Sequence, residues 1–364
     1  MNRRLWIAGT GKMAHNVGLY FLRRGFDVTW LSAVPERLAG LQRRVQKTLR
    51  ESPAATAQFR ALSDLPLPPA DIVLEATAES LAAKRAVAEA VLPHVPDTTL
   101  IASLSSSLLP ADIHPRCLGV HFFYPVELTA VAEVIAVGQA EDAWPAVEAW
   151  LRPCGIRMIR QDNRSAFAVN RLLLPLQNEC LRLLAEGWSA DDVDKASATP
   201  LTPFGQLAFM DSVGLDVVRA AADNYAARMN SADAAALAAL REGLAGLVGQ
   251  GKRGRKNANG FLVGEPLPVP HPRRPPADAE TLRRVKQRFL WLALNSCLRF
   301  LEDGQLSDED LEVVLTEVFH ADSSLRQAMG QEPRPALAAE LARMFDQTGL
   351  PYWIPARALG PGKG

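Results

Sequence analysis

The chain has 364 residues, and its 40 Lys and Arg balance 40 Asp and Glu, so the formal net charge is zero. Such a balance argues against a nucleic-acid coat protein and against a polybasic membrane-surface protein. Hydrophobic residues make up 48% of the chain and charged residues 22%, which is close to ordinary globular usage and argues against disorder. At roughly 150 residues per domain, the length predicts two to three domains.

The four cysteines are widely spaced and form no CxxC pair, so we expect neither a disulfide framework nor a zinc site. No apolar run approaches the ~18 residues that a membrane-spanning helix needs. The first residues run straight into an apolar segment and leave no room for a cleavable signal. We therefore expect a cytoplasmic protein with no metal, no membrane contact and no nucleic-acid partner.

The first half of the chain alternates short apolar runs with longer stretches of helical periodicity. The apolar runs predict strands over 5–8, 28–31, 72–74, 99–101, 118–120 and 132–135. Apolar residues at helical spacing predict helices over 13–24, 36–50 and about 82–91. Strands that alternate with helices through short links are typical of a doubly wound parallel sheet. We therefore predict an α/β Rossmann-type domain over residues 1–162.

The pattern changes near residue 163, beyond which strand signals almost vanish. Helical periods predict long helices over 167–187 and 283–303. Between them, residues 264–276 hold six prolines in thirteen residues, which excludes a helix or a central strand and favours an extended linker. We therefore predict two all-α helical domains joined by a Pro-rich linker, with the boundaries 163–263, 264–278 and 279–364.

The two long helices are similar in sequence. Residues 178–187 match residues 295–304 at a constant offset of 117, with six identities in ten positions and a Gly at the end of each segment. Chance similarity between two amphipathic helices is the alternative, but this many identities in register favour a duplication. We predict that the two helical domains are a tandem repeat.

A Gly-rich segment lies between the first predicted strand and the first predicted helix. It has the form GxGxxA, in which Gly9, Gly11 and Ala14 surround Thr10, Lys12 and Met13. In a dinucleotide-binding fold the first Gly allows a tight turn, the second lets the backbone approach a pyrophosphate, and the third small residue lets the helix pack closely. The helix N-terminus favours the phosphate charge. We predict a dinucleotide site here; a plain Gly-rich turn is the alternative.

The second predicted strand ends without the acidic residue that would bind the ribose hydroxyls. Ser32 stands there instead, so no carboxylate repels a 2′-phosphate, and Arg37 lies about one turn beyond. We therefore predict NAD or NADP as the cofactor, with Ser32 and Arg37 in its site. The alternative for Arg37 is a solvated helix residue.

A histidine and a glutamate stand out in the last two predicted strands. His121 comes just past the strand over 118–120, at an edge where such sheets bind ligands. Glu133 is alone in an apolar run, where a carboxylate needs a partner. A His–Glu pair is a usual way to hold a general base. Taken alone, the two residues fit a core histidine and a strand-edge glutamate better than a catalytic pair.

Several motifs occur in the order and spacing of one enzyme family. They lie at 103–108, at 121–126 followed by 131–135, at 167–171, at 203–204 followed by 211–216, and at 254–261. At these positions the chain resembles the L-3-hydroxyacyl-CoA dehydrogenase family, and more closely the dehydrogenase part of the multifunctional fatty-acid β-oxidation enzymes. The resemblance implies a 3-hydroxyacyl thioester, on CoA or an acyl carrier, as the substrate.

The resemblance also implies roles for individual residues. His121 would be the general base that takes the proton of the 3-hydroxyl group as hydride leaves carbon 3, and Glu133 would orient it. Ser106 and Asn170 would donate hydrogen bonds to the substrate's oxygens. Each of these residues stands at the matching position of a family motif.

Two further residues, Glu79 and Lys84, match a family motif near the nicotinamide and its ribose. The chain departs from the family pattern at Ser32, Leu104, Tyr124, Arg164 and Thr202. These departures leave two alternatives open. One is a dehydrogenase of a small 3-hydroxy acid or another secondary alcohol. The other is a non-catalytic relative that keeps the fold for assembly or ligand sensing.

The second helical repeat is not expected to be catalytic, because Gln287 stands where the offset of 117 would place a copy of Asn170. In the multifunctional enzymes that the chain resembles, the second repeat occupies the surface through which shorter relatives dimerise. We therefore expect a monomer or a homodimer.

Overall fold

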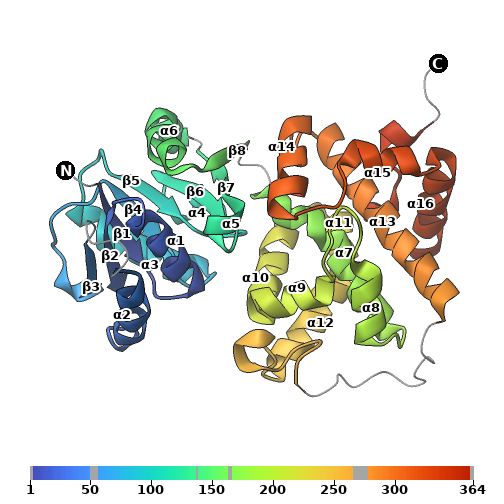
Figure 1. Cartoon of the computed structure of the whole chain (residues 1–364), viewed down its shortest axis with the longest axis horizontal. Helices are drawn as coiled ribbons and strands as arrows, with labels where there is room; N and C mark the ends of the chain where they lie inside the picture. Colours follow the sequence, from blue (N-terminus) through green and yellow to red (C-terminus); the bar gives the residue numbers. More distant parts are fainter. Residues whose placement is uncertain (1–2, 50–55, 137, 163–165, 265–277, 361–364) are drawn as a thin grey trace. The chain divides into compact units, whose positions relative to one another are not determined.

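The computed structural model of the chain describes residues 3–49, 56–136, 138–162, 166–264 and 278–360 (Figure 1). The chain divides into two compact units, Met1–Phe167 and Ala168–Gly364. The predicted Pro-rich linker falls almost entirely outside the described residues, as does Arg164. The division of the second unit into a domain over 163–263 and a repeat over 279–364 stays a prediction.

The first unit is built on an eight-stranded sheet with the order β3-β2-β1-β4-β5-β6-β7-β8. In this order, all neighbouring strands from β3 through β2, β1, β4 and β5 to β6 are parallel. Strand β7 pairs antiparallel with β6, and β8 runs parallel to β7. The predicted Rossmann-type class is thereby confirmed. The strands are β1 (Arg4–Ala8), β2 (Asp27–Ser32), β3 (Ala57–Ala61), β4 (Ile72–Glu75), β5 (Leu100–Ser103), β6 (Cys117–Phe122), β7 (Val131–Ile135) and β8 (Arg157–Gln161).

The antiparallel step between β6 and β7 departs from the fully parallel sheet that the alternating pattern predicts. The connection between these strands holds only the one-turn helix α5 (Val126–Thr129). A parallel crossover needs a dozen or more residues, so this short link can only return the chain in the opposite direction.

Helices cover both faces of the sheet. Leu5 and Ile7 of β1 face a core cluster that includes Phe21 and Trp30, whereas Trp6 and Ala8 face a second cluster on the other side. This alternation follows from the period of two along a strand. The helices of the first unit are α1 (Lys12–Leu22), α2 (Glu36–Leu49), α3 (Leu81–Val91), α4 (Pro110–Ile113), α5 and α6 (Trp144–Leu151).

The second unit is helical, and its two longest helices, α7 and α13, pack against each other. They correspond to the helices predicted over 167–187 and 283–303. The helices are α7 (Ala168–Ala185), α8 (Ala190–Ser197), α9 (Gln206–Val213), α10 (Leu215–Ala226), α11 (Ser231–Ala236), α12 (Ala238–Gly249), α13 (Ala279–Glu302), α14 (Asp308–Val313), α15 (Leu325–Gln331) and α16 (Arg334–Thr348).

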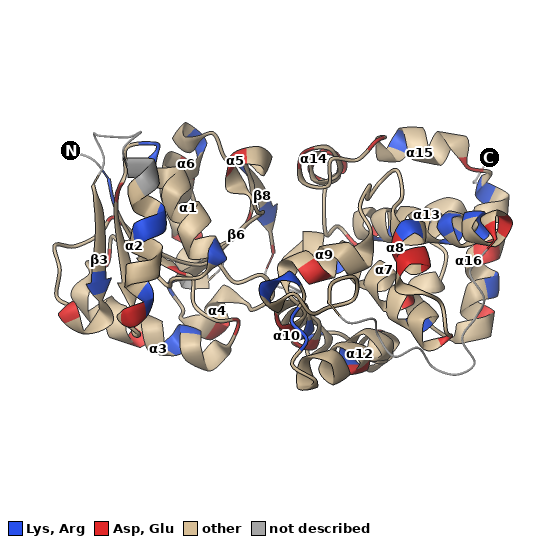
Figure 2. Cartoon of the chain, turned by 60° about the horizontal axis from the view of Figure 1, so that its bottom comes forward, with Lys and Arg blue, Asp and Glu red and all other residues tan. Residues whose placement is uncertain are grey.

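The charged residues of both units are mixed in sign, as the zero net charge suggests: Lys and Arg are interspersed with Asp and Glu on the helices (Figure 2). Among the helices that the structure describes, none has the length and apolarity that a bilayer crossing requires. Within the same residues, no group of three or more His, Cys, Asp or Glu side chains is arranged to hold a metal ion.

Candidate active site

The predicted Gly-rich turn joins β1 to α1. Gly9 has a φ of +146°, and a Cβ atom on it would lie 2.3 Å from the carbonyl oxygen of Ala76 at the end of β4, so only glycine fits. Gly11 is the N-cap of α1, and a Cβ atom on it would meet nothing within 4 Å. The backbone at Gly11 is therefore open to a ligand that approaches closely.

Helix α1 packs tightly on β2, which fixes where its N-terminus points. Ala14 is fully buried, and its carbonyl oxygen accepts a hydrogen bond from Nε1 of Trp30 at 3.0 Å. A Cβ atom on Gly18 would lie 2.2 Å from the Trp30 ring. Met13 packs on the same core. The small residues thus allow the close helix–strand contact that dinucleotide-binding turns use.

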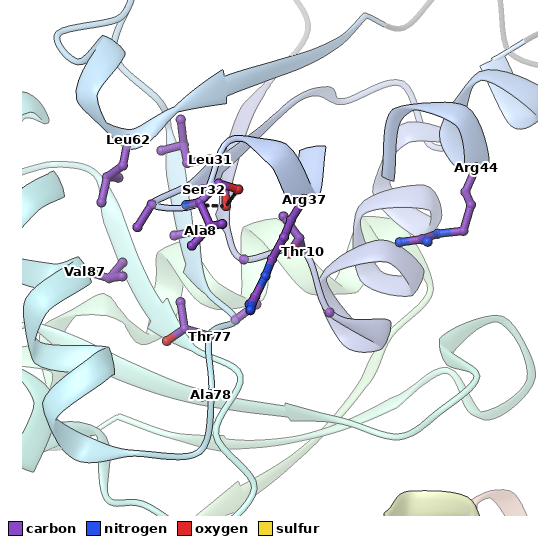
Figure 3. A pocket seen from close by; sticks show the side chains of 15 residues that line it. Ala8, Thr10, Leu31, Ser32, Arg37, Arg44, Leu62, Thr77, Ala78 and Val87 are labelled. Carbon is purple, nitrogen blue, oxygen red and sulfur yellow. Dashed lines mark hydrogen bonds between the residues drawn. The ribbon is translucent and has the colours of Figure 1, made fainter. Parts of the chain in front are cut away.

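A pocket of about 610 Å³ opens beside this turn, at the carboxyl ends of β1, β2 and β4 (Figure 3). Among the described residues, no side chain caps the N-terminus of α1, and its first turn holds no acidic residue. Its backbone dipole therefore favours an anion such as a pyrophosphate. The pocket is lined by residues 8–11, 31–34, 37, 44, 62, 76–78 and 87.

These features fit a nicotinamide dinucleotide: an open backbone at Gly11, an uncapped helix N-terminus and a pocket large enough for part of the ligand. Of the residues predicted to bind the cofactor, Gly9, Gly11, Ser32 and Arg37 line the pocket. Lys12 lies at the first position of α1, and its Nζ stands 3.7 Å from the centre of the Tyr124 ring. Tyr124 is thus in cation–π contact beside the turn.

Glu79 holds the serine-rich loop that follows β5. Its Oε1 accepts hydrogen bonds from the backbone N–H groups of Ser106 and Ser107, both at 3.0 Å, and from Oγ of Ser105 at 2.6 Å. Burial raises the pKa of Glu79, but Lys84 and the serine hydrogen bonds outweigh it, so the pKa lies below its ordinary value. The ionised carboxylate therefore fixes the loop that carries Ser106.

Lys84 points into the protein and has an exposed fraction of only 1%. Its Nζ lies 2.8 Å from Oε2 of Glu75 and 3.5 Å from Oε2 of Glu79. Glu75, at the end of β4, also accepts a hydrogen bond from Oγ of Ser103 at 2.6 Å. Glu75 was not predicted from the sequence, although a carboxylate that ends a buried strand was a usable signal. Neither Glu79 nor Lys84 is among the described residues that line the pocket.

His121 and Glu133 face each other across the antiparallel pair of β6 and β7. Nδ1 of His121 lies 2.8 Å from Oε2 of Glu133, which is fully buried. An ionised carboxylate only accepts hydrogen bonds, so against such a carboxylate Nδ1 is the donor, and the basic lone pair of that tautomer is on Nε2. The prediction that His121 follows the strand end was wrong: it is the last residue but one of β6, because that strand continues to Phe122.

Aromatic rings enclose the histidine. The ring centres of Phe123 and Phe167 lie 4.8 and 5.0 Å from that of His121, whose exposed fraction is 8%. A mostly dry surrounding strengthens the interaction of the imidazole with its carboxylate partner.

The second unit carries the predicted residue Asn170 and also a cluster of basic residues over 252–256. Asn170 lies in the first turn of α7. In the basic cluster over 252–256, Lys256 and Arg253 lie 2.8 and 3.7 Å from the carboxylate of Asp216, so part of its charge is already neutralised.

Comparisons with known proteins agree with this geometry. Residues 4–152 match the 3-hydroxyacyl-CoA dehydrogenase NAD binding domain, and residues 167–263 match the 3-hydroxyacyl-CoA dehydrogenase C-terminal domain. The fatty acid oxidation complex subunit alpha of Shewanella sp. (strain MR-7) is 29% identical over 71% of this chain, and the matched region is 38% of that protein. The chain therefore spans well under half the length of this curated relative.

Two solved structures are also similar. The 3-hydroxybutyryl-CoA dehydrogenase of Escherichia coli superposes with a TM-score of 0.74 over 99% of this chain and 98% of that one; at 17% identity this likeness concerns the fold alone. M. tuberculosis FadB2 is 26% identical, with a TM-score of 0.62 over 72% of this chain and 99% of that one. The two domain matches together confirm the predicted family: the chain belongs to the 3-hydroxyacyl-CoA dehydrogenases, a family of oxidoreductases with an N-terminal NAD-binding domain.

Proposed function

We propose that the chain interconverts a 3-hydroxyacyl thioester, on CoA or an acyl carrier, and its 3-oxo form by hydride transfer with NAD or NADP. The observation that carries this proposal is the His121–Glu133 pair, with its 2.8 Å contact and its buried carboxylate. Desolvation makes a buried ionisable pair of this kind costly, and a histidine held at Nδ1 is suited to proton transfer at Nε2.

In the oxidative direction, Nε2 of His121 takes the proton of the 3-hydroxyl group. Glu133 keeps the imidazole in the required tautomer and stabilises its charged form. The bound dinucleotide supplies the hydride acceptor. Ser106 and Asn170 orient the substrate by hydrogen bonds to its oxygens, and Glu79 acts on Ser106 through the loop it holds. Orientation of this kind contributes to the rate because the reacting atoms start near their reactive geometry.

The test is the oxidation of NADH or NADPH by the full chain with acetoacetyl-CoA, followed at 340 nm. We expect turnover, and we expect His121→Ala to lower kcat by about 10²–10⁴-fold, the usual share of a general acid–base group. Glu133→Gln should lower kcat with little change in KM, because it removes orientation and charge stabilisation rather than binding.

Three results would count against the proposal. Nucleotide binding without turnover of any 3-oxoacyl thioester would remove the assigned reaction. Full activity of His121→Ala would remove the assigned base. Faster turnover of free acetoacetate than of acetoacetyl-CoA would favour the alternative of a small 3-hydroxy acid.

A further inference from the structure

The charged residues of the nucleotide pocket are all of one sign. Arg37 and Arg44 line it, and no Asp or Glu is among its described lining residues. In a chain whose net charge is zero, this is a local concentration of positive charge. It lies beside the end of β2, the place where a dinucleotide-binding fold meets the ribose of the adenosine.

The end of β2 offers nothing to hold a free 2′-hydroxyl as a carboxylate would. Ser32 is its last residue, and Oγ of Ser32 both donates to the carbonyl oxygen of Val34 at 2.9 Å and accepts from its N–H at 3.1 Å. The serine hydroxyl is thus committed to a local turn. An acidic residue here would repel a 2′-phosphate, and its absence removes that barrier.

The two arginines share a face of α2. They are seven residues apart, which places them about two turns and ~10 Å from each other along the helix axis. Arg37 lines the same pocket as Thr10 and Thr77 (Figure 3). One guanidinium nitrogen of Arg44 lies 4.0 Å from where a Cβ atom of Gly40 would stand, so this side chain folds back along the helix toward Arg37.

Neither guanidinium forms an ion pair or a hydrogen bond with another side chain or with the backbone in the described part of the chain. Both side chains are exposed. The influence of Arg44 reaches α1 as well: burial, and then the charge of Arg44, lower the pKa of His15 in the first turn of that helix.

We infer that this pocket selects a dinucleotide with a 2′-phosphate, NADP over NAD, with Arg37 as the direct phosphate ligand and Arg44 as a second, supporting cation. The inference rests on the proposed function, because it concerns the nucleotide of the same reaction. A guanidinium matches a phosphate with two parallel hydrogen bonds, and a phosphate monoester carries about −1.5 to −2 charges at neutral pH.

The test is a calorimetric titration of the full chain with NADPH and with NADH at low ionic strength. We expect NADPH to bind at least about tenfold more tightly, which corresponds to ~1.4 kcal/mol. Arg37→Gln should remove about tenfold of the NADPH affinity, and Arg44→Gln about threefold, while both leave NADH within twofold. Ser32→Asp should reverse the preference. Salt should shrink it, because both arginines are exposed.

Arg43→Gln is the matched control, since Arg43 is exposed on the same helix but is not among the residues lining the pocket. It should leave both affinities unchanged. A second readout uses fragments: adenosine 2′,5′-bisphosphate should bind more tightly than ADP, and this gap should close in Arg37→Gln.

Equal or tighter binding of NADH, or an NADPH affinity that Arg37→Gln leaves unchanged, would overturn the inference. Failure of both nucleotides to bind would overturn it together with the proposed function. Preferential binding of NADPH without turnover of acetoacetyl-CoA would uphold the inference and reject the proposed reaction. Turnover of acetoacetyl-CoA with NADH as the preferred nucleotide would reject the inference and uphold the proposed reaction.

Discussion

The second unit holds two helical segments that the sequence predicts to be copies of one arrangement, and their comparison separates scaffold from site. Asn178 of α7 accepts a hydrogen bond at Oδ1 from the N–H of Leu240 at 2.9 Å, and Asn295 of α13 accepts one from the N–H of Ala356 at 2.8 Å. The partners lie 62 and 61 residues further along the chain. Each buried Asn therefore accepts from the corresponding part of its own predicted copy, and Asn178 in addition donates from Nδ2 to the hydroxyl of Tyr352 in the second one.

The helix that follows begins in the same way in both copies. Oγ of Ser189 accepts from the N–H of Asp192 at the start of α8, and Oγ of Ser307 accepts from the N–H of Asp310 at the start of α14, both at 3.1 Å. Such N-caps satisfy backbone donors that a helix start leaves without a partner. These shared details support the predicted tandem duplication.

The copies differ at the position proposed to meet substrate. Asn170 begins α7, whereas its counterpart Gln287 donates from Nε2 to Oε2 of Glu332 at 2.9 Å, a bond that ties α13 to the end of α15. The difference indicates that the predicted second copy repeats the scaffold and that Gln287 has a structural role in it.

The largest expected effect comes from a substitution that removes a contact of the scaffold common to both predicted copies. Asn295→Leu leaves the N–H of Ala356 and the carbonyl oxygens of Tyr352 and Ile354 without their partner, and each buried unpaired group costs about 1–3 kcal/mol. We expect a large fall in the urea midpoint and faster amide hydrogen exchange over 350–360.

Asn178→Leu is the matched change in the first copy. It removes two bonds, one of them to the hydroxyl of Tyr352, so the fall should be smaller and the faster exchange should move to the N-terminus of α12. Equal exchange patterns in the two variants would contradict the idea that each Asn serves its own copy.

The next largest effect tests whether Asn170 and its counterpart Gln287 have different roles. Asn170→Ala should lower kcat/KM for acetoacetyl-CoA by about ten- to a hundredfold, ~1.4–2.7 kcal/mol of transition-state stabilisation, with the urea midpoint nearly unchanged. Gln287→Ala should do the opposite and lower the midpoint with kcat/KM intact. A similar loss of activity in both variants would reject the assignment of substrate binding to the first copy alone.

The smallest effect concerns a charge present in one copy only. Glu179 is 2% exposed, and Ser296 is its counterpart. Burial raises the pKa of Glu179 above its ordinary value, although Arg182 and Arg288 oppose the shift. A raised folded-state pKa means that the folded protein holds the proton more tightly than the unfolded chain does. The stabilisation is present below the unfolded pKa of about 4.3 and is lost as the pH rises through the folded pKa.

Glu179→Gln removes this titration, so the stability of the variant relative to the parent should increase as the pH rises from about 4 upward through the folded pKa. Urea midpoints at pH 4 and pH 7 measure it, with Ser296→Ala as the uncharged control. A parent that gains stability over the variant across this range would show the arginines to outweigh burial.

Two strands were missed in the sequence, and both are edge strands of the sheet, β3 and β8. A central strand is buried on both faces and reads as a continuous apolar run, whereas an edge strand is partly solvated. In β8 two of five residues are arginines, and β3 alternates between half-buried and exposed positions. Their signal therefore resembled that of a loop.

The cofactor turn was predictable because its requirements are local. Gly9 needs a positive φ and a close approach to Ala76, and both act within a strand–turn–helix unit that the sequence displays. The serine-rich loop after β5 was less predictable from the sequence. Ser106 was found by its motif, but the Glu79 hydrogen bonds and the Glu75–Lys84 pair that support it join β4, α3 and the loop after β5, which are distant in the chain.

The composition and periodicity of the chain by themselves determined a neutral, globular protein with an α/β half and a helical half, and identity at a fixed offset predicted a duplicated helix, because these patterns are properties of the chain alone. Only the tertiary structure decided that His121 faces Glu133. Twelve residues separate them, and their contact depends on the short link that reverses β7 and on the register of its pairing with β6. A shift of one residue would turn the carboxylate to the other face of the sheet.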